Sequence, residues 1–169
     1  RQMCIRDRIT IAAMVKELHL NLDGGRFNKI AQPEADELLI TGKGANGQCR
    51  LLLSASASLP LIYFTSKNKP SPMTAPNFCM LLRKHIGSAR VSDIRQPGME
   101  RVVMFELEHL NELGDPCKKV LIMELMGKHS NIIFCDDKGM ILDSIKHVSS
   151  HMSSVREAVS YTHLRAHET

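Results

Sequence analysis

The chain has 169 residues, of which 43% are hydrophobic and 24% are charged, with a formal net charge of +4. This balance is ordinary for a globular chain, and the length suits one domain with its own core. No apolar run approaches the ~18 residues of a membrane span, which excludes a membrane-spanning helix from the sequence given.

The two ends of the chain differ from the rest. Residues 1–8 and 159–169 back-translate to strings that are nearly reverse complements and that match a transposon adapter used in library preparation. We expect both to be adapter-derived artefacts and Ile9–Ala158 to be a fragment of a longer reading frame. Residues 1–8 hold a surplus of two positive charges, so this central segment has a net charge near +2. The basic pI is therefore weak support for a nucleic-acid partner.

Four cysteines lie in the central segment, and no two are spaced as a C-x-x-C pair. Each lies in or beside an apolar stretch, as small buried thiols do. This predicts a reducing, cytoplasmic compartment without disulfides. A zinc site formed by these cysteines and His129 is disfavoured because no ligand pair is closely spaced, so no metal or cofactor is predicted.

An amphipathic helix is predicted first, from apolar residues at helical spacing that end at Asp23-Gly24-Gly25. These residues are Ile11, Met14, Val15, Leu18 and Leu22. Short apolar or alternating runs then predict strands at Arg26–Gln32, Glu37–Gly42, Gln48–Ser54 and Leu61–Thr65. The stretch Gly42–Gly47 predicts a hairpin connection, because it lacks the Gly-Lys-Ser/Thr and the following helix of a nucleotide-binding loop.

A stiff linker, Lys69–Pro76, leads to a second predicted helix from about Pro76 to Ile86, with Gly87 at its end. Its buried face is predicted to contain Phe78, Leu81, Leu82 and Ile86. Further strands are predicted at Val91–Gln96, Arg101–Glu108, Lys119–Met126, Asn131–Cys135 and Met140–Ile145. Asp136–Gly139 predicts a turn whose glycine takes a positive φ.

The order of these elements is helix, strands, helix, strands. No β-α-β-α alternation occurs, which disfavours a parallel doubly wound sheet. We predict an α+β fold: an antiparallel, β-rich domain in two packed layers with two principal helices.

Four segments together resemble the amino-terminal domain of the NFACT family. Gly25–Pro33 is similar to the family's GGRI-x-KI-x-QP opening, and Phe78–His85 reads FCMLLRKH, the most specific of the four. Glu124–Ile133 resembles the E-x-MG[RK]HSNII segment. Lys146-His147 with Ser153–Arg156 resembles the closing KH…S-x-R stretch. The four occur in family order across Ile9–Ala158.

The resemblance implies a function in ribosome-associated quality control. Bacterial members of the family bind a large ribosomal subunit that still holds stalled peptidyl-tRNA. They recruit alanyl-tRNA and support untemplated addition of alanine to the nascent chain. It also implies a fold similar to the amino-terminal domain of formamidopyrimidine-DNA glycosylases, and a role that is not enzymatic.

The family's Asp-Arg pair, which is implicated in handling tRNA, matches Glu100-Arg101 here. Arg101 could contact a phosphate or a base edge through two parallel hydrogen bonds, and Glu100 could accept from a base amine or orient the arginine. Glutamate keeps the charge but places the carboxylate one methylene further out. The structural alternative is an exposed charge pair beside a strand.

Four further residues are candidates for binding RNA. Arg83 and Lys84 could contact its backbone, although cations in the last turn of a helix also complement the helix dipole. Lys128 and His129 fall at a predicted turn, where exposed side chains could contact phosphates or sugars. A nucleophilic pair of His129 and Ser130 is disfavoured, because adjacent residues on a strand point oppositely.

Two other functions stay open. The older family label, fibronectin-binding protein, suggests a surface adhesin, although the cysteine pattern leans against it. Similarity of fold alone suggests a DNA-repair enzyme, but fold does not establish chemistry. Such an enzyme uses its processed amino-terminal proline as the nucleophile, and this sequence shows no such terminus.

Overall fold

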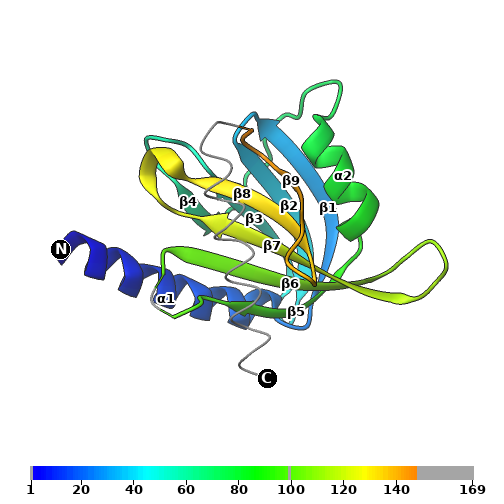
Figure 1. The fold of residues 1–169 in the computed structure, drawn as a ribbon, viewed down its shortest axis with the longest axis horizontal. Helices are drawn as coiled ribbons and strands as arrows, with labels where there is room; N and C mark the ends of the chain where they lie inside the picture. The colour runs from blue at the N-terminus through cyan, green and yellow to red at the C-terminus, as the bar shows by residue number, and fades with distance from the viewer. Residues whose placement is uncertain (1, 99, 148–169) are drawn as a thin grey trace.

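The computed structural model describes residues 2–98 and 100–147, with side chains described from Thr10 onward. The segments 159–169 and Ser153–Arg156 lie outside this range. Two helices, α1 (Gln2–Leu22) and α2 (Asn77–Ile86), accompany nine strands and the short 3-10 helix η1 (Gly127–His129). Figure 1 shows α1 along one edge of the molecule and α2 against β1. Neither helix, within the described residues, is long and apolar enough to cross a membrane.

All nine strands pair antiparallel in one sheet, in the order β4-β3-β2-β1-β5-β6-β7-β8-β9. The α+β prediction, with antiparallel strands and two principal helices, is therefore confirmed. The strands are β1 (Arg26–Glu34), β2 (Glu37–Gly44), β3 (Gly47–Ser54), β4 (Leu61–Phe64), β5 (Arg90–Arg95), β6 (Val102–Leu110), β7 (Pro116–Glu124), β8 (Asn131–Asp136) and β9 (Ile141–Ser144).

The sheet consists of two halves that meet at a single register pair. Arg26 of β1 lies opposite Arg90 of β5, and no further pair joins these strands. Around this junction Phe27 N–H donates to the Ala89 carbonyl at 2.9 Å and Val91 N–H donates to the Gly25 carbonyl at 2.7 Å. The inner faces of both halves belong to one hydrophobic core. The two predicted layers are thus two halves of one bent sheet (Figure 1).

The helices cover this core with the apolar residues that their spacing predicts. Ile11, Val15, Leu18 and Leu22 of α1 are buried, and Met14 packs at the margin of the core. In α2 the buried residues are Phe78, Cys79, Leu82 and Ile86. Leu81 is only partly buried and packs at the margin of the core, so the prediction holds for it in part. Cys79 completes the buried face because it precedes Leu82 by three residues.

The end of α1 packs closely against the hairpin of β1 and β2, because glycines stand where the backbones meet. A Cβ atom at Gly44 would overlap the Asn21 carbonyl, and one at Gly42 would lie 2.8 Å from the Arg26 carbonyl oxygen. Gly25 is enclosed in the same way by the Lys43 carbonyl. This close approach explains Gly25, while Gly24 has a φ of 76°, a conformation that favours glycine.

Two predicted turns are confirmed. The β2–β3 hairpin closes with Gly44 opposite Gly47, which has a φ of 96°. Gly139 has a φ of 86° after β8, and the Asp136 carboxylate accepts from the N–H groups of Lys138 and Met140 at 2.9 Å each. Asp136 therefore stabilises its turn through its own side chain.

Candidate nucleic-acid interface

Four of the six predicted site residues gather at one end of the β6–β7 pair, which we call the loop end. Glu100 and Arg101 precede β6, while Lys128 and His129 belong to η1 after β7. The strands bring them together because Val102 pairs with Glu124, and Leu125 N–H donates to the Arg101 carbonyl at 2.9 Å. The β6–β7 pairing thus places the β5–β6 and β7–β8 loops beside each other.

The backbone around Glu100 is set by a turn. Gly98 has a φ of 56°, and Glu100 N–H donates to the Pro97 carbonyl at 3.2 Å. The Gln96 side-chain amide donates to the Glu100 carbonyl. Glu100 is exposed and Arg101 is half-buried, so the guanidinium is not sealed in the core. A half-buried arginine beside an exposed carboxylate can still reach a partner in solvent.

The loop that carries Lys128 and His129 is held by its neighbours. Buried Ser130 donates from Oγ to the Gly127 carbonyl at 2.7 Å and accepts from Met126 N–H at 2.9 Å. Asn131 Oδ1 accepts from Lys146 N–H at 3.1 Å. Ser130 and Asn131 are therefore structural, and exposed Lys128 and His129 are the residues of this segment that face solvent.

Arg83 and Lys84 lie at the other end of the β6–β7 pair. β6 has nine residues, which at about 3.3 Å per residue places its two ends roughly 26 Å apart. Arg83 donates from Nε to the Ile30 carbonyl at 2.7 Å, which fixes the base of its guanidinium. Both residues are exposed. The structure therefore divides the predicted residues between two ends and does not unite them in one site.

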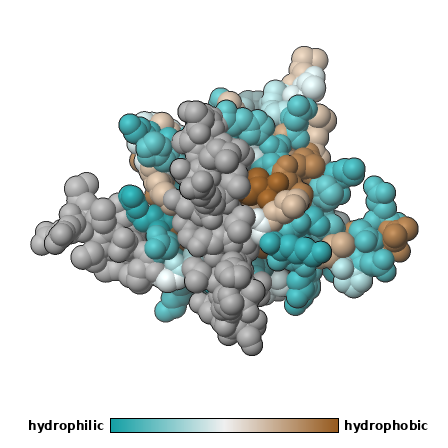
Figure 2. Space-filling view, viewed as in Figure 1, coloured by the Kyte–Doolittle hydropathy of each residue, from teal (hydrophilic) through white to brown (hydrophobic). Residues whose placement is uncertain are grey.

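Two adjoining pockets form a basic groove between α2, the sheet junction and the β6–β7 hairpin. The first, of about 470 Å³, is lined by the cations Arg26, Arg83, Lys84 and Arg90, with Glu108 as the carboxylate. The second, also of about 470 Å³, is lined by Lys84, His85, His109 and Lys119, with Glu112 at its edge. Figure 2 shows hydrophilic colour along this hairpin, with hydrophobic atoms at its tip, where Leu110 and Leu113 are exposed.

The two histidines of the groove lie near each other in a partly buried setting. Their ring centroids are 6.2 Å apart in an edge-to-face arrangement. Burial lowers the pKa of His85, and nearby Lys119 lowers it further. Burial also lowers the pKa of His109, against a hydrogen bond to the Leu110 carbonyl that raises it. Both imidazoles are thus biased toward the neutral form.

Sequence reasoning did not find Arg26, Arg90, His109 or Lys119 as site residues. These residues lie on four different strands, β1, β5, β6 and β7. Only the strand register therefore brings them beside α2. The sequence held one local signal for Arg26 as a site residue, its position directly after the glycine pair. Nothing local marks the other three.

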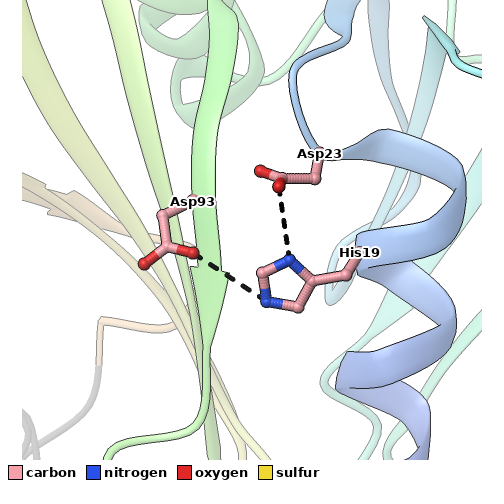
Figure 3. A group of neighbouring side chains, drawn as sticks. All are labelled: His19, Asp23 and Asp93. Atoms are coloured by element: carbon pink, nitrogen blue, oxygen red, sulfur yellow. Dashed lines mark ion pairs between the residues drawn. The ribbon is translucent and has the colours of Figure 1, made fainter.

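A further polar cluster ties α1 to β5, as Figure 3 shows. His19 lies between two carboxylates. Its Nδ1 is 3.6 Å from the Asp23 carboxylate, and its Nε2 is 3.8 Å from the Asp93 carboxylate. Among the described residues, this cluster is the one group of three potential metal ligands, and its ligand atoms lie within 4.8 Å of one another. Each side chain is more than a third exposed. Exposed ion pairs of this kind contribute roughly 0–1 kcal/mol.

The fold and this surface define an antiparallel α+β domain with a divided cationic face. The model of the NFACT N-terminal and middle domains matches residues 7–162. The chain is similar to "Rqc2 homolog RqcH" of Bacillus subtilis, with 40% identity over 146 residues, covering 85% of the chain and 25% of that protein. The human "Ribosome quality control complex subunit NEMF" is 28% identical over 164 residues, covering 95% of the chain and 14% of that protein.

Solved structures agree with these relatives. The N-terminal domain of the fibronectin-binding protein PavA from Streptococcus pneumoniae superposes with a TM-score of 0.81 at 36% identity, covering 84% of the chain and 54% of that structure. The fibrinogen-binding protein from Staphylococcus aureus gives a TM-score of 0.78 at 30% identity, covering 87% and 52%. The chain belongs to the NFACT family, and it spans about a quarter of the length of its bacterial curated relatives.

Proposed function

We propose that this domain binds RNA in ribosome-associated quality control. Its partners would be an obstructed large ribosomal subunit, the stalled peptidyl-tRNA and an incoming tRNA, which the family resemblance makes alanyl-tRNA. Binding would support untemplated C-terminal alanine tailing in the cytoplasm. Family membership and the names of the relatives support this proposal. The observation that carries it is the gathering of Glu100, Arg101, Lys128 and His129 at the loop end.

The chemistry at the loop end is recognition and not catalysis. The planar guanidinium of Arg101 suits a phosphate or a base edge, and exposed Glu100 can accept from an amine. Lys128 and His129 would add phosphate contacts from the adjacent loop. The domain would therefore hold RNA in position, while its side chains take no part in bond formation.

The proposal is tested by tRNA binding to the intact protein that contains this domain. Arg101→Ala should weaken binding, and it should make the affinity less dependent on salt because fewer counterions are released. Lys16→Ala, which removes an exposed cation of α1, is the control and should behave as the parent protein. Equal affinity of the parent and Arg101→Ala across salt concentrations would contradict the proposed site.

A fibronectin-binding adhesin is the second candidate, because the solved relative with a TM-score of 0.81 is named a fibronectin-binding protein. Surface-immobilised fibronectin would test it directly. Saturable binding by the intact protein that is unchanged in Arg101→Ala would favour the adhesin, as would a secretion signal or cell-wall anchor in the complete gene. The expected similarity to formamidopyrimidine-DNA glycosylases stays a prediction.

A further inference from the structure

We propose that the basic groove is a second site for an RNA backbone, separate from the loop end. The inference rests on the proposed function, since that function makes RNA the polyanion. It adds Arg26, Arg90 and Lys119 to Arg83 and Lys84 as phosphate-binding residues. The RNA would then be held at two places on one domain.

The positive charges of the groove come from separate elements of the fold. Arg26 comes from β1, Arg90 from β5 and Lys119 from β7, while Arg83 and Lys84 end α2. Complementing the helix dipole accounts for the two cations on α2. It does not account for three cations on three strands that converge on the same groove. Against these five stand two carboxylates among the lining residues, Glu108 and Glu112.

The sheet junction places two arginines side by side. Arg26 and Arg90 are directly opposite each other on antiparallel strands, an arrangement in which like charges destabilise a sheet. Arg90 is compensated by Glu108, with 3.1 Å between Nη1 and the carboxylate. Arg26 donates to a neutral group, the Ser88 carbonyl, at 3.3 Å. The junction therefore keeps a positive charge that an anion in the groove would neutralise.

In the second pocket, a histidine holds the lysine in place. Lys119 Nζ lies 3.2 Å from His109 Nε2, and His109 Nδ1 lies 3.2 Å from the Leu110 carbonyl oxygen. A carbonyl only accepts, so Nδ1 carries the proton and Nε2 accepts from the lysine. A neutral His109 thus orients the Lys119 ammonium beside the groove. Unlike a carboxylate, it adds no negative charge that would compete with an anion for the lysine.

The shape of the groove favours a chain of phosphates over a single anion. The two pockets share Lys84, His85 and His109, so they form one continuous surface with cations at both ends. A backbone with regularly repeated charges can contact both pockets at once. An acidic protein is the competing partner, and the experiment separates it from RNA.

The test measures binding of fluorescently labelled tRNA and of single-stranded polyuridine to the intact protein. The groove variant is Arg26→Gln with Lys84→Glu, both at exposed positions. The control is Lys16→Glu on α1, which matches the charge reversal of Lys84→Glu. The groove variant should bind RNA about tenfold or more weakly, and its salt slope should fall by about 1–2, because each phosphate that is no longer neutralised keeps roughly one counterion. Lys84→Gln alone should give a smaller change in the same direction.

The outcomes distinguish the groove from the loop end. Combining the groove variant with Arg101→Ala should multiply the two losses, as expected for sites that act separately. If Arg101→Ala weakens RNA binding and neither groove variant does so, this inference is wrong and the proposed function stands. If neither site affects RNA binding, both are wrong. If the groove variant loses binding of labelled polyaspartate of matched charge but keeps the parent affinity for tRNA and polyuridine, the partner is an acidic protein and the RNA assignment falls.

Discussion

The two ends of the β6–β7 pair present positive charge in different ways. At the loop end, backbone hydrogen bonds and buried Ser130 shape two adjacent loops, and the cations stand beside exposed Glu100. At the basic groove, side chains from one helix and four strands converge on two pockets. Each loop of the loop end is shaped by local contacts, and the β6–β7 pairing alone joins the two, whereas the groove needs one helix and four strands to converge. A change in core packing should therefore affect the groove more than the loop end.

The largest effect is expected from Leu82→Ala. Leu82 is fully buried in α2 next to Arg83 and Lys84, and removing such a side chain typically costs about 2–5 kcal/mol. Chemical denaturation should show this loss in the free energy of unfolding. Met80→Ala, on the exposed side of the same helix, should change stability little. In Leu82→Ala, the contribution of the groove to RNA binding should therefore decrease more than the contribution of the loop end.

A smaller effect, confined to the loop end, is expected from Ser130→Ala. The change leaves Met126 N–H and the Gly127 carbonyl without their side-chain partner, at a cost of about 1–3 kcal/mol. Hydrogen exchange should increase at Met126 and at Ser130, whose N–H donates to the Gly127 carbonyl, while α2 stays protected. Unchanged exchange at both positions would show that the Ser130 side chain does not hold this loop.

The groove should be strengthened by Glu108→Gln. This change removes the carboxylate that pairs with Arg90, and an exposed pair of this kind is worth roughly 0–1 kcal/mol. RNA should bind about two- to fivefold more tightly, since about 1.4 kcal/mol corresponds to a factor of ten. Glu34→Gln, at an exposed position of β1, is the matched control. Weaker binding by Glu108→Gln would mean that the carboxylate contacts the ligand or orients Arg90 for it.

The smallest effect concerns pH. The pKa values of His85 and His109 are lowered in the fold, so below about pH 6.5 the unfolded chain takes up protons that the folded chain does not. Stability should therefore fall as the pH drops below this value, and the fall should be smaller in His109→Gln. Lys84, Lys119 and Glu112 also act on His85, with the two lysines opposing its protonation.

The same histidines predict a pH dependence of binding. A phosphate in the groove favours the protonated imidazoles, and this added charge should outweigh the loss of the His109 Nε2 acceptor that orients Lys119, so RNA affinity should rise as the pH falls from about 7.5 to about 6. Titration of RNA binding over this range should show a smaller rise in His109→Gln than in the parent. The loop end contains exposed His129, so His129→Gln is the comparison that separates the two ends.

Much of the fold follows from sequence pattern alone. Helical spacing from Ile11 to Leu22 and the glycines after it predict α1, and alternation between turn residues predicts all nine strands to within a few residues. Pro76, however, is the residue before α2 and not a residue of its first turn. The bend of the sheet at Arg26 and Arg90 could not be predicted, because it depends on a register pair between residues far apart in sequence.

The candidate site, like the fold, was predictable from the sequence only in part. Motif resemblance named Glu100, Arg101, Lys128 and His129, and strand pairing then placed them together. It also named Arg83 and Lys84 but could not show that they lie at the opposite end of β6. Arg90 and Lys119 carry no signal of their own, since charged residues on strands are common on any solvated face.

The order of the strands has a consequence for how the chain folds. Every neighbouring pair in the sheet is consecutive in sequence except β1 and β5, so each half can form by successive closure of short hairpins. The single non-consecutive pair, Arg26 with Arg90, closes a long loop. Such closure is slow because conformational entropy must be given up before the stabilising interactions form. Pulse-labelling hydrogen exchange during refolding should accordingly show protection of amides within each half before those at Phe27 and Val91.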